Sequence, residues 1–399
     1  MASRPPARIV SRKGVPTMTD PAIDYLRDYV AIPSVNPMGR SDLPGEIVGE
    51  AAFASHLLEQ LRGLSVDAVQ VGSPERPSVV AEVQAQQAGG DTVLVASHLD
   101  TVPVDGMTIP PFDPQVEGGK LYGRGSCDTK AGMAALVAAL EKVLNRGVLR
   151  RNLILVGEAD EELGSQGVYD VLTNLAGRRP DWVLATEPTD LRVVNAHKGV
   201  VHVRMEARGR ACHASNPDEG KNAIILLSRA ALALDALAQE LSARRHPELG
   251  PATLSVGILS GGHAPNIVPD HAHLVADRRV LPGETLEGVR AEFEEALVAA
   301  GVSDAVEVVS CSLEKPTLST PEDHPAVVGC TRALAATGQP GERSGVAFGT
   351  DAGVFEAAGL PGVVLGPGSI LQAHTAREFV EIDQVETMTA FFVELLSGA

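Results

Sequence analysis

Three short runs of apolar, β-forming residues restrict the fold of this chain more than any other feature. They are VLVAS at 93–97, NLILVG at 152–157 and WVLAT at 182–186. Each run is apolar throughout, which is typical of strands that are buried on both faces of a parallel sheet. Segments with helical spacing of apolar residues alternate with these runs, and the clearest covers 129–147. The pattern predicts an α/β fold with a mostly parallel sheet covered by helices.

The pattern changes near residue 195, which indicates a second domain. The segment VVHVRMEAR at 200–208 alternates apolar and polar residues, as a strand with one exposed face does. The segments after it predict a helix, two strands, a helix and a strand, which is a split β-α-β plan of the ferredoxin-like kind. We therefore expect an α+β domain at 195–310, inserted into one domain formed by 18–194 and 311–399.

The start of the chain differs from the rest in composition. Residues 1–17 are basic and rich in proline, and they lack the apolar stretch of a secretory signal. We expect either a disordered tail without function or a true start at Met18. No run of about 20 apolar residues predicts a membrane span. The cysteines form no C-x-x-C pair, which favours reduced thiols in the cytoplasm. They are Cys127, Cys212, Cys311 and Cys330.

The charge balance limits the class of partner. The chain has 33 Lys and Arg against 51 Asp and Glu, a formal net charge of −18. Such a surface repels nucleic acid and anionic lipid, so we expect neither as a partner. A carboxylate-rich chain can, however, gather several cations in one cleft.

Side chains that bind metals follow each of the three apolar runs. His98 and Asp100 follow the first, Glu161 and Glu162 follow the second, and Glu187 follows the third. The carboxyl ends of parallel strands share one edge of the sheet, where ligands bind. Donors from three separate strands should therefore meet at one place.

Two further donors belong to loops that we expect at the same edge. Asp128 lies in the Gly-rich turn GRGSCDTKAG, and His374 follows a later apolar strand. Two histidines with three carboxylates form a mixed set suited to zinc, with cobalt or manganese as alternatives. Five ligands suit two metal ions that lie about 3.5–4 Å apart and share one carboxylate. Asp100 and one glutamate of the Glu161–Glu162 pair then remain as an orienting group and a general base.

Each motif also has a simpler interpretation. The Gly-rich turn resembles a phosphate-binding loop but lacks the spacing of either common nucleotide motif. A nucleotide-dependent enzyme therefore stays an alternative. His98 and Asp100 on their own could be a polar strand end. His271 and His273 have ligand spacing but lie in the inserted domain, so we interpret them as structural.

Eight segments resemble the M20 family of dinuclear zinc amidohydrolases and peptidases. They occur in family order from about residue 20 to the C-terminus: SHLDTVP, LYGRGSCDTKAGMAA, ADEELGSQG, ATEPT, GRACHAS, GGHAPNIVPD, DRRVLPGE and QAHTAREFVEI. The resemblance implies a zinc-peptidase catalytic domain with an inserted lid and dimerisation domain.

The resemblance also implies two divalent metal ions, zinc with cobalt as an alternative. Asp128 would bridge the two ions, and a cis peptide bond often follows this aspartate in the family. His98 and Glu187 would complete one site, and Glu162 and His374 would complete the other.

The remaining roles implied by the resemblance concern catalysis and substrate. Asp100 would orient His98, and Glu161 would be the general base. In a homodimer formed through the inserted domain, His213 would reach the partner's active site. Asn266 and Arg279 would line the substrate pocket.

Within the family, three segments are most like those of acetylornithine deacetylases: NAHKG, FGTDAGVF and VLGPGSILQAH. This implies metal-dependent hydrolysis of an N-acyl amino acid, with N-acetylornithine giving ornithine and acetate for arginine biosynthesis. The alternatives are a succinyl-diaminopimelate desuccinylase, a general N-acyl amino acid hydrolase, a dipeptidase or carboxypeptidase, and a non-catalytic binding protein.

Overall fold

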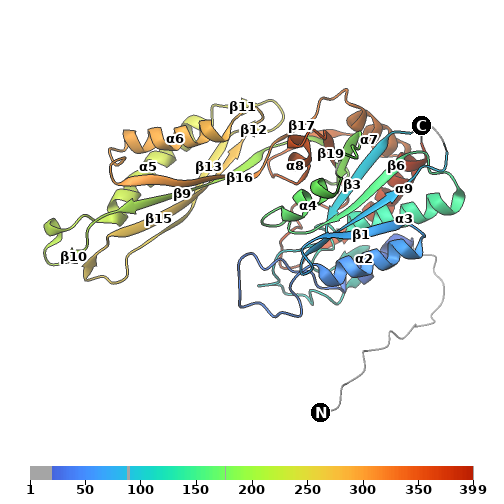
Figure 1. Cartoon of the computed structure of the whole chain (residues 1–399), viewed down its shortest axis with the longest axis horizontal. Helices are drawn as coiled ribbons and strands as arrows, with labels where there is room; N and C mark the ends of the chain where they lie inside the picture. Colours follow the sequence, from blue (N-terminus) through green and yellow to red (C-terminus); the bar gives the residue numbers. More distant parts are fainter. Residues whose placement is uncertain (1–19, 88–89, 176, 399) are drawn as a thin grey trace, which may run out of the picture.

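The computed structural model describes residues 20–87, 90–175 and 177–398, so the predicted tail at 1–17 lies outside the described residues. Figure 1 shows two lobes joined side by side. The small lobe comprises residues 199–315, and the large lobe comprises the other described residues. The chain enters the small lobe at the start of β9 (Gly199–Arg208) and leaves it at the end of β16 (Val306–Lys315).

A nine-stranded sheet forms the centre of the large lobe, in the order β1-β2-β6-β3-β7-β19-β8-β17 with β18 also paired to β8. Its four central strands, β6, β3, β7 and β19, are parallel, and antiparallel pairs flank them. The predicted α/β class with a parallel core is therefore confirmed. The strands are β1 (Asp67–Gly72), β2 (Pro77–Val83), β3 (Thr92–His98), β6 (Asn152–Glu158), β7 (Trp182–Ala185), β8 (Val193–His197), β17 (Leu318–Ser319), β18 (Arg343–Val346) and β19 (Gly362–Val364).

Helices cover both faces of this sheet, which explains its solidly apolar strands. Val93 and Val95 of β3 join a buried cluster with helices α1, α2, α3, α7 and α9, whereas Leu94 and Ala96 join a second cluster with α4 and α8. The helices are α1 (Pro21–Val30), α2 (Ala51–Gly63), α3 (Lys130–Arg146), α4 (Gln166–Leu175), α7 (Pro325–Ala336), α8 (Ala352–Ala357) and α9 (Ile382–Ser397). Successive side chains of a strand point to opposite faces of the sheet. Because both faces are covered here, the residues at odd and at even positions must all be apolar.

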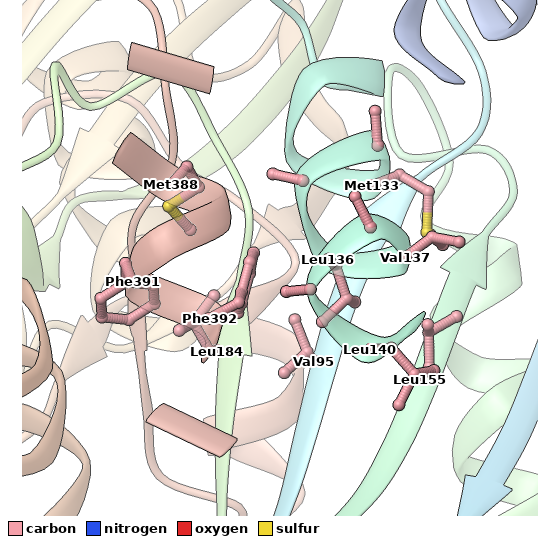
Figure 2. Packing of buried hydrophobic residues seen from close by; sticks show 14 of the residues in the cluster. Val95, Met133, Leu136, Val137, Leu140, Leu155, Leu184, Met388, Phe391 and Phe392 are labelled. Atoms are coloured by element: carbon pink, nitrogen blue, oxygen red, sulfur yellow. The ribbon is translucent and has the colours of Figure 1, made fainter. Parts of the chain in front are cut away.

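The two stretches of chain on either side of the small lobe share one core. Figure 2 shows Leu136 of α3 and Phe392 of α9 in the same cluster as Val95. Phe392 has no exposed surface, and truncating such a residue to alanine typically costs about 3–5 kcal/mol. This packing fixes the late loops of the large lobe against the early strands.

The small lobe is a four-stranded antiparallel sheet in the order β13-β15-β9-β16, with α5 and α6 packed on one face. Along the chain its main elements run strand, helix, two strands, helix, strand, as the sequence predicts. The elements are α5 (Ala223–Leu241), α6 (Leu286–Ala299), η1 (Pro217–Glu219), β10 (Cys212–His213), β11 (Arg245–His246), β12 (Gly250–Pro251), β13 (Thr253–Gly261), β14 (Ile267–Val268) and β15 (His271–Val280). The sheet continues to Lys315, beyond the expected boundary at residue 310.

A three-stranded sheet completes the large lobe, with β4 (Gln115–Glu117), β5 (Lys120–Tyr122) and β20 (Phe379–Glu381). It pairs the segment before Asp128 with the segment after His374. Within the described part of the chain, no helix is both long and apolar enough to cross a membrane.

Candidate metal centre

The parallel strands bring their polar ends to one edge of the large sheet. His98 is the last residue of β3 and lies opposite Glu158, the last residue of β6. Ala96 of β3 pairs with Ala185, the last residue of β7. The donors that follow β6 and β7 therefore come next to the end of β3.

Five side chains meet at this edge in two groups, each with ligand atoms within 4.8 Å of one another. The first group is His98, Asp128 and Glu187, and the second is Asp128, Glu162 and His374. Nε2 of His98 lies 2.9 Å from Oδ1 of Asp128 and 4.0 Å from Oε2 of Glu187. Nε2 of His374 lies 3.3 Å from Oδ2 of Asp128 and 3.1 Å from Oε2 of Glu162. Asp128 thus offers one oxygen to each group.

The ring of His98 is held by its own strand end. Its Nδ1 hydrogen-bonds the backbone carbonyl of Asp100 at 2.9 Å, and the nearest oxygen of the Asp100 carboxylate is 3.5 Å away. A carbonyl only accepts, so Nδ1 donates and Nε2 faces Asp128; when the ring is neutral, the lone pair on Nε2 would be available to a metal ion. The contact between Asp100 and His98 is therefore made mainly by the backbone of Asp100.

The carboxylate of Asp100 orients the segment with the two glutamates. It accepts hydrogen bonds from the backbone amides of Glu161 and Glu162, each at 3.1 Å. It also accepts one from Nδ2 of Asn36 at 2.8 Å. Asn36 had no distinguishing signal in the sequence, because it comes from a loop far from the motifs.

Asp128 is held by a residue to which the sequence assigned no role. Oε1 of Glu378 accepts hydrogen bonds from the backbone amides of Cys127 at 2.9 Å and Asp128 at 3.1 Å. Arg124 pairs with Oε2 of Glu378 at 2.6 Å. The peptide bond after Asp128 is cis. Glu378 lies in the segment QAHTAREFVEI, so its position within a recognised motif was the one signal available.

Burial and like charge shift the protonation equilibria of the centre. Burial, with the nearby Asp128 carboxylate, raises the pKa of Glu162 to about 7. Burial also raises the pKa of Glu187 well above its ordinary range, although the charge of His98 opposes this. Hydrogen bonds with Asp128 and Glu162 raise the pKa of His374 to about 10.

This donor set fits a pair of divalent cations. Three buried carboxylates close together are costly as anions unless positive charge compensates them. Two neutral imidazoles and three carboxylates, one of them shared, form the N/O ligand set of a two-metal site. The residues that would hold the ions are His98, Asp128, Glu162, Glu187 and His374.

Glu161 is buried beside the two groups, and a lysine holds it. Nζ of Lys315 donates to Oε1 of Glu161 at 2.7 Å and to the backbone carbonyl of Glu161 at 2.8 Å. Burial raises the pKa of Glu161, and the charge of Lys315 opposes the rise. The sequence offered no reason to single out Lys315.

Two of the three predicted residues of the inserted domain, His213 and Asn266, are not brought to this centre within one chain. His213 lies in β10, which pairs with β14 at the tip of the small lobe, away from the large sheet (Figure 1). The amide of Ala214 donates to the carbonyl of Asn266 at 3.0 Å, so Asn266 lies at the same tip. Arg279 lies in β15 and pairs with both carboxylate oxygens of Asp277, at 2.7 and 3.1 Å.

Comparison with known sequences gives a consistent result. Residues 94–398 match peptidase family M20/M25/M40. The acetylornithine deacetylase of Proteus mirabilis (strain HI4320) is 30% identical over 387 residues, which cover 94% of this chain and 96% of the relative.

Comparison with solved structures gives the same fold at lower identity. A tripeptidase from Staphylococcus aureus superposes with a TM-score of 0.78 and 20% identity, covering 94% of this chain and 97% of the other. A dinuclear metal-binding M20 peptidase from Bacillus subtilis superposes with a TM-score of 0.70 and 16% identity, covering 94% and 96%.

Proposed function

Because the chain belongs to peptidase family M20/M25/M40, we propose that it hydrolyses the amide bond of N-acyl amino acids, with N-acetylornithine as substrate. The observation that carries this proposal is the pair of convergent ligand groups that share Asp128. The relatives named acetylornithine deacetylase support the choice of substrate. The reaction would release ornithine for arginine biosynthesis. The free cysteines of the described chain support a reducing compartment, the cytoplasm.

The five ligands would hold two divalent ions, and zinc suits this mixture of imidazole and carboxylate. When bound, the ions would polarise the amide carbonyl and lower the pKa of the attacking water toward about 7. Asp128 would offer one carboxylate oxygen to each ion. Glu378 supports it by accepting hydrogen bonds from the backbone amides of Cys127 and Asp128.

Glu161 would move the proton. It adjoins Glu162 in the chain and is buried, so its carboxylate is shielded from bulk water. It would accept a proton from the attacking water and then give it to the departing nitrogen. General acid–base catalysis of this kind contributes about 10²–10⁴-fold to the rate.

Arg279 and Asn266 would bind the substrate, and His213 would stabilise the transition state. The guanidinium of Arg279 matches the two oxygens of a substrate α-carboxylate. In the free chain the guanidinium of Arg279 is paired with the carboxylate of Asp277, so the substrate carboxylate would have to compete with Asp277 for it. His213 would donate a hydrogen bond to the carbonyl oxygen as it becomes negative, and losing such a donor typically costs about 10²–10³-fold.

A homodimer would bring His213 to the reaction, because His213 lies at the tip of the small lobe of its own chain. Co-expression of His213→Ala with His98→Ala, under two different tags, tests this. In the mixed dimer, one site combines intact ligands with the intact His213 of the partner subunit. Activity in the mixed dimer, absent from each variant alone, is the expected result. An inactive mixed dimer would contradict action in trans.

A substrate panel tests the proposed reaction. The purified protein is stripped with a chelator, reloaded with zinc or cobalt, and assayed with N-acetylornithine, N-succinyl-diaminopimelate, other N-acetyl amino acids and dipeptides. We expect metal-dependent hydrolysis with the highest kcat/KM for N-acetylornithine. A preference for the succinyl compound or for dipeptides would change the substrate. Metal-independent turnover, or none with any compound, would refute the function.

A further inference from the structure

Lys315 has an unusual set of partners for a residue of the small lobe. It is the last residue of β16, yet its ammonium lies within the large lobe. Besides Glu161, it donates to Oγ of Ser165 at 2.7 Å and to Oδ1 of Asp351. Ser165 in turn donates to the same oxygen of Asp351 at 2.6 Å. The ammonium thus links Glu161 to Ser165, just before α4, and to Asp351, just before α8.

The backbone of Lys315 is held firmly where the lobes join. Lys315 pairs with Val200 of β9, so the strands entering and leaving the small lobe are neighbours at this point. A Cβ added to Gly349 would lie only 2.9 Å from Cβ of Lys315, and one added to Gly199 would lie 2.9 Å from its carbonyl oxygen. These close approaches leave the lysine little freedom to shift without its neighbours.

The electrostatics keep the ammonium charged. Burial alone would lower the pKa of Lys315, but the carboxylates of Asp351 and Glu161 outweigh it and hold the pKa above its ordinary value. A buried ammonium with two carboxylate partners and a hydroxyl is well compensated. The structure gives it no contact with the five ligand side chains of the metal centre.

We propose that Lys315 is a positioning residue, which fixes the carboxylate of Glu161 beside the metal centre from the strand that attaches the small lobe. This inference rests on the proposed role of Glu161 as the general base. Lys315 itself touches neither substrate nor metal in this scheme. Its absence would leave the Glu161 side chain free to rotate, and a misplacement of about 1 Å can cost about 10²-fold in rate.

The test compares Lys315→Met with Lys315→Arg and with a matched control, Lys198→Met. Lys198 is also a buried lysine at the junction of the lobes, but its Nζ donates to the carbonyl of Pro251 at 2.6 Å and not to Glu161. For Lys315→Met we expect kcat to fall about 10–100-fold, with KM and bound metal unchanged. Lys315→Arg should recover part of kcat, and Lys198→Met should resemble the wild type. Lys315→Gln replaces Lys315→Met if the latter does not fold.

A crystal structure of the same variant gives a readout that does not depend on turnover. We expect the Glu161 carboxylate to be displaced or to take several rotamers in Lys315→Met. An unmoved carboxylate, a kcat within twofold of the wild type, or an equal loss in Lys198→Met would overturn the inference. A wild-type protein that hydrolyses nothing in the panel would instead refute the proposed function, and the crystal structures would still decide the role of Lys315.

Discussion

The large and small lobes each carry a cluster of histidine and carboxylates, and the two clusters differ in kind. In the large lobe, the side chain of His98 is 1% exposed and its donors converge from strand ends and loops. In the small lobe, His202 is 46% exposed on the open face of the sheet. Its ring lies 3.5 Å from Asp277 and 3.7 Å from Glu314. Among the described residues, only the donors of the large lobe form groups compact enough for a metal ion.

The difference shows that residue types alone do not make a metal site. On the small sheet, Arg279 already neutralises Asp277, and Arg204 pairs with Glu206 beside His271. Water screens what charge remains, so these pairs need no cation. In the large lobe, the ligand carboxylates are buried, and the described structure gives them only histidines as cationic partners. Convergence of the donors, with the side chains of all of them except the half-exposed His374 buried, is therefore what distinguishes the candidate metal centre.

The most direct test of this difference between the lobes is to replace one histidine in each cluster. His98→Ala should abolish both metal binding and hydrolysis, because it deletes a proposed ligand whose side chain is almost completely buried. His202→Ala should keep the metal content and most of the activity. Metal analysis and an N-acetylornithine assay on both variants check this. Retention of two metals by His98→Ala, or their loss in His202→Ala, would contradict the distinction drawn between the lobes.

A second pair of substitutions separates the proposed general base, Glu161, from the proposed metal ligands. Glu161→Gln should lower kcat by about 10²–10⁴-fold while both metals stay bound, since the amide keeps the shape but cannot take up the proton. Glu314→Gln, the matched change on the small lobe, should alter kcat by less than about twofold. Steady-state kinetics with metal analysis provides the measurement. Normal turnover by Glu161→Gln would remove Glu161 from the mechanism.

Metal removal should change the stability of the large lobe. A ligand present at about 1,000 times its Kd stabilises the folded state by about 4 kcal/mol. Chelation of the wild type should therefore lower the free energy of unfolding by about this amount, and zinc should restore it. His98→Ala should respond far less, and His202→Ala should respond as the wild type does. Denaturant unfolding with and without chelator would show whether the stabilisation depends on His98.

The smallest expected effect is the pH dependence of the His202 pair. A hydrogen bond with Asp277 raises the pKa of His202, although burial opposes it, and Glu314 adds to the rise while Arg279 reduces it. A raised histidine pKa stabilises the fold fully below the ordinary value of 6.5, and this stabilisation is lost as pH rises through the raised pKa.

Because the ring is about half exposed, we expect less than about 1 kcal/mol. The difference in unfolding free energy between wild type and His202→Gln should thus be largest below pH 6.5 and decrease as the pH rises further. Denaturant titrations at several pH values measure it. A difference that grows with pH would mean that His202 is not protonated in this pair.

The sequence by itself determined the fold class and the edge of the sheet where donors gather. Apolar runs buried on both faces can only be satisfied between two helix layers, and residues that follow parallel strands must share an edge. Local pattern therefore predicted His98, Asp128, Glu187 and His374 as donors together with one glutamate of the Glu161–Glu162 pair. The family resemblance then assigned Glu162 as the ligand. All of these lie next to strands or turns with a clear signal of their own.

Only the tertiary structure decided what holds these side chains. Asn36 and Lys315 have no local pattern, and Glu378 has only its place within a recognised motif, because each reaches the centre by packing of segments far apart in the chain. The separation of His213 from the centre likewise depends on how the two lobes are joined. Short-range periodicity reports which face of an element is buried, whereas a polar contact between distant loops depends on the packing of the whole core.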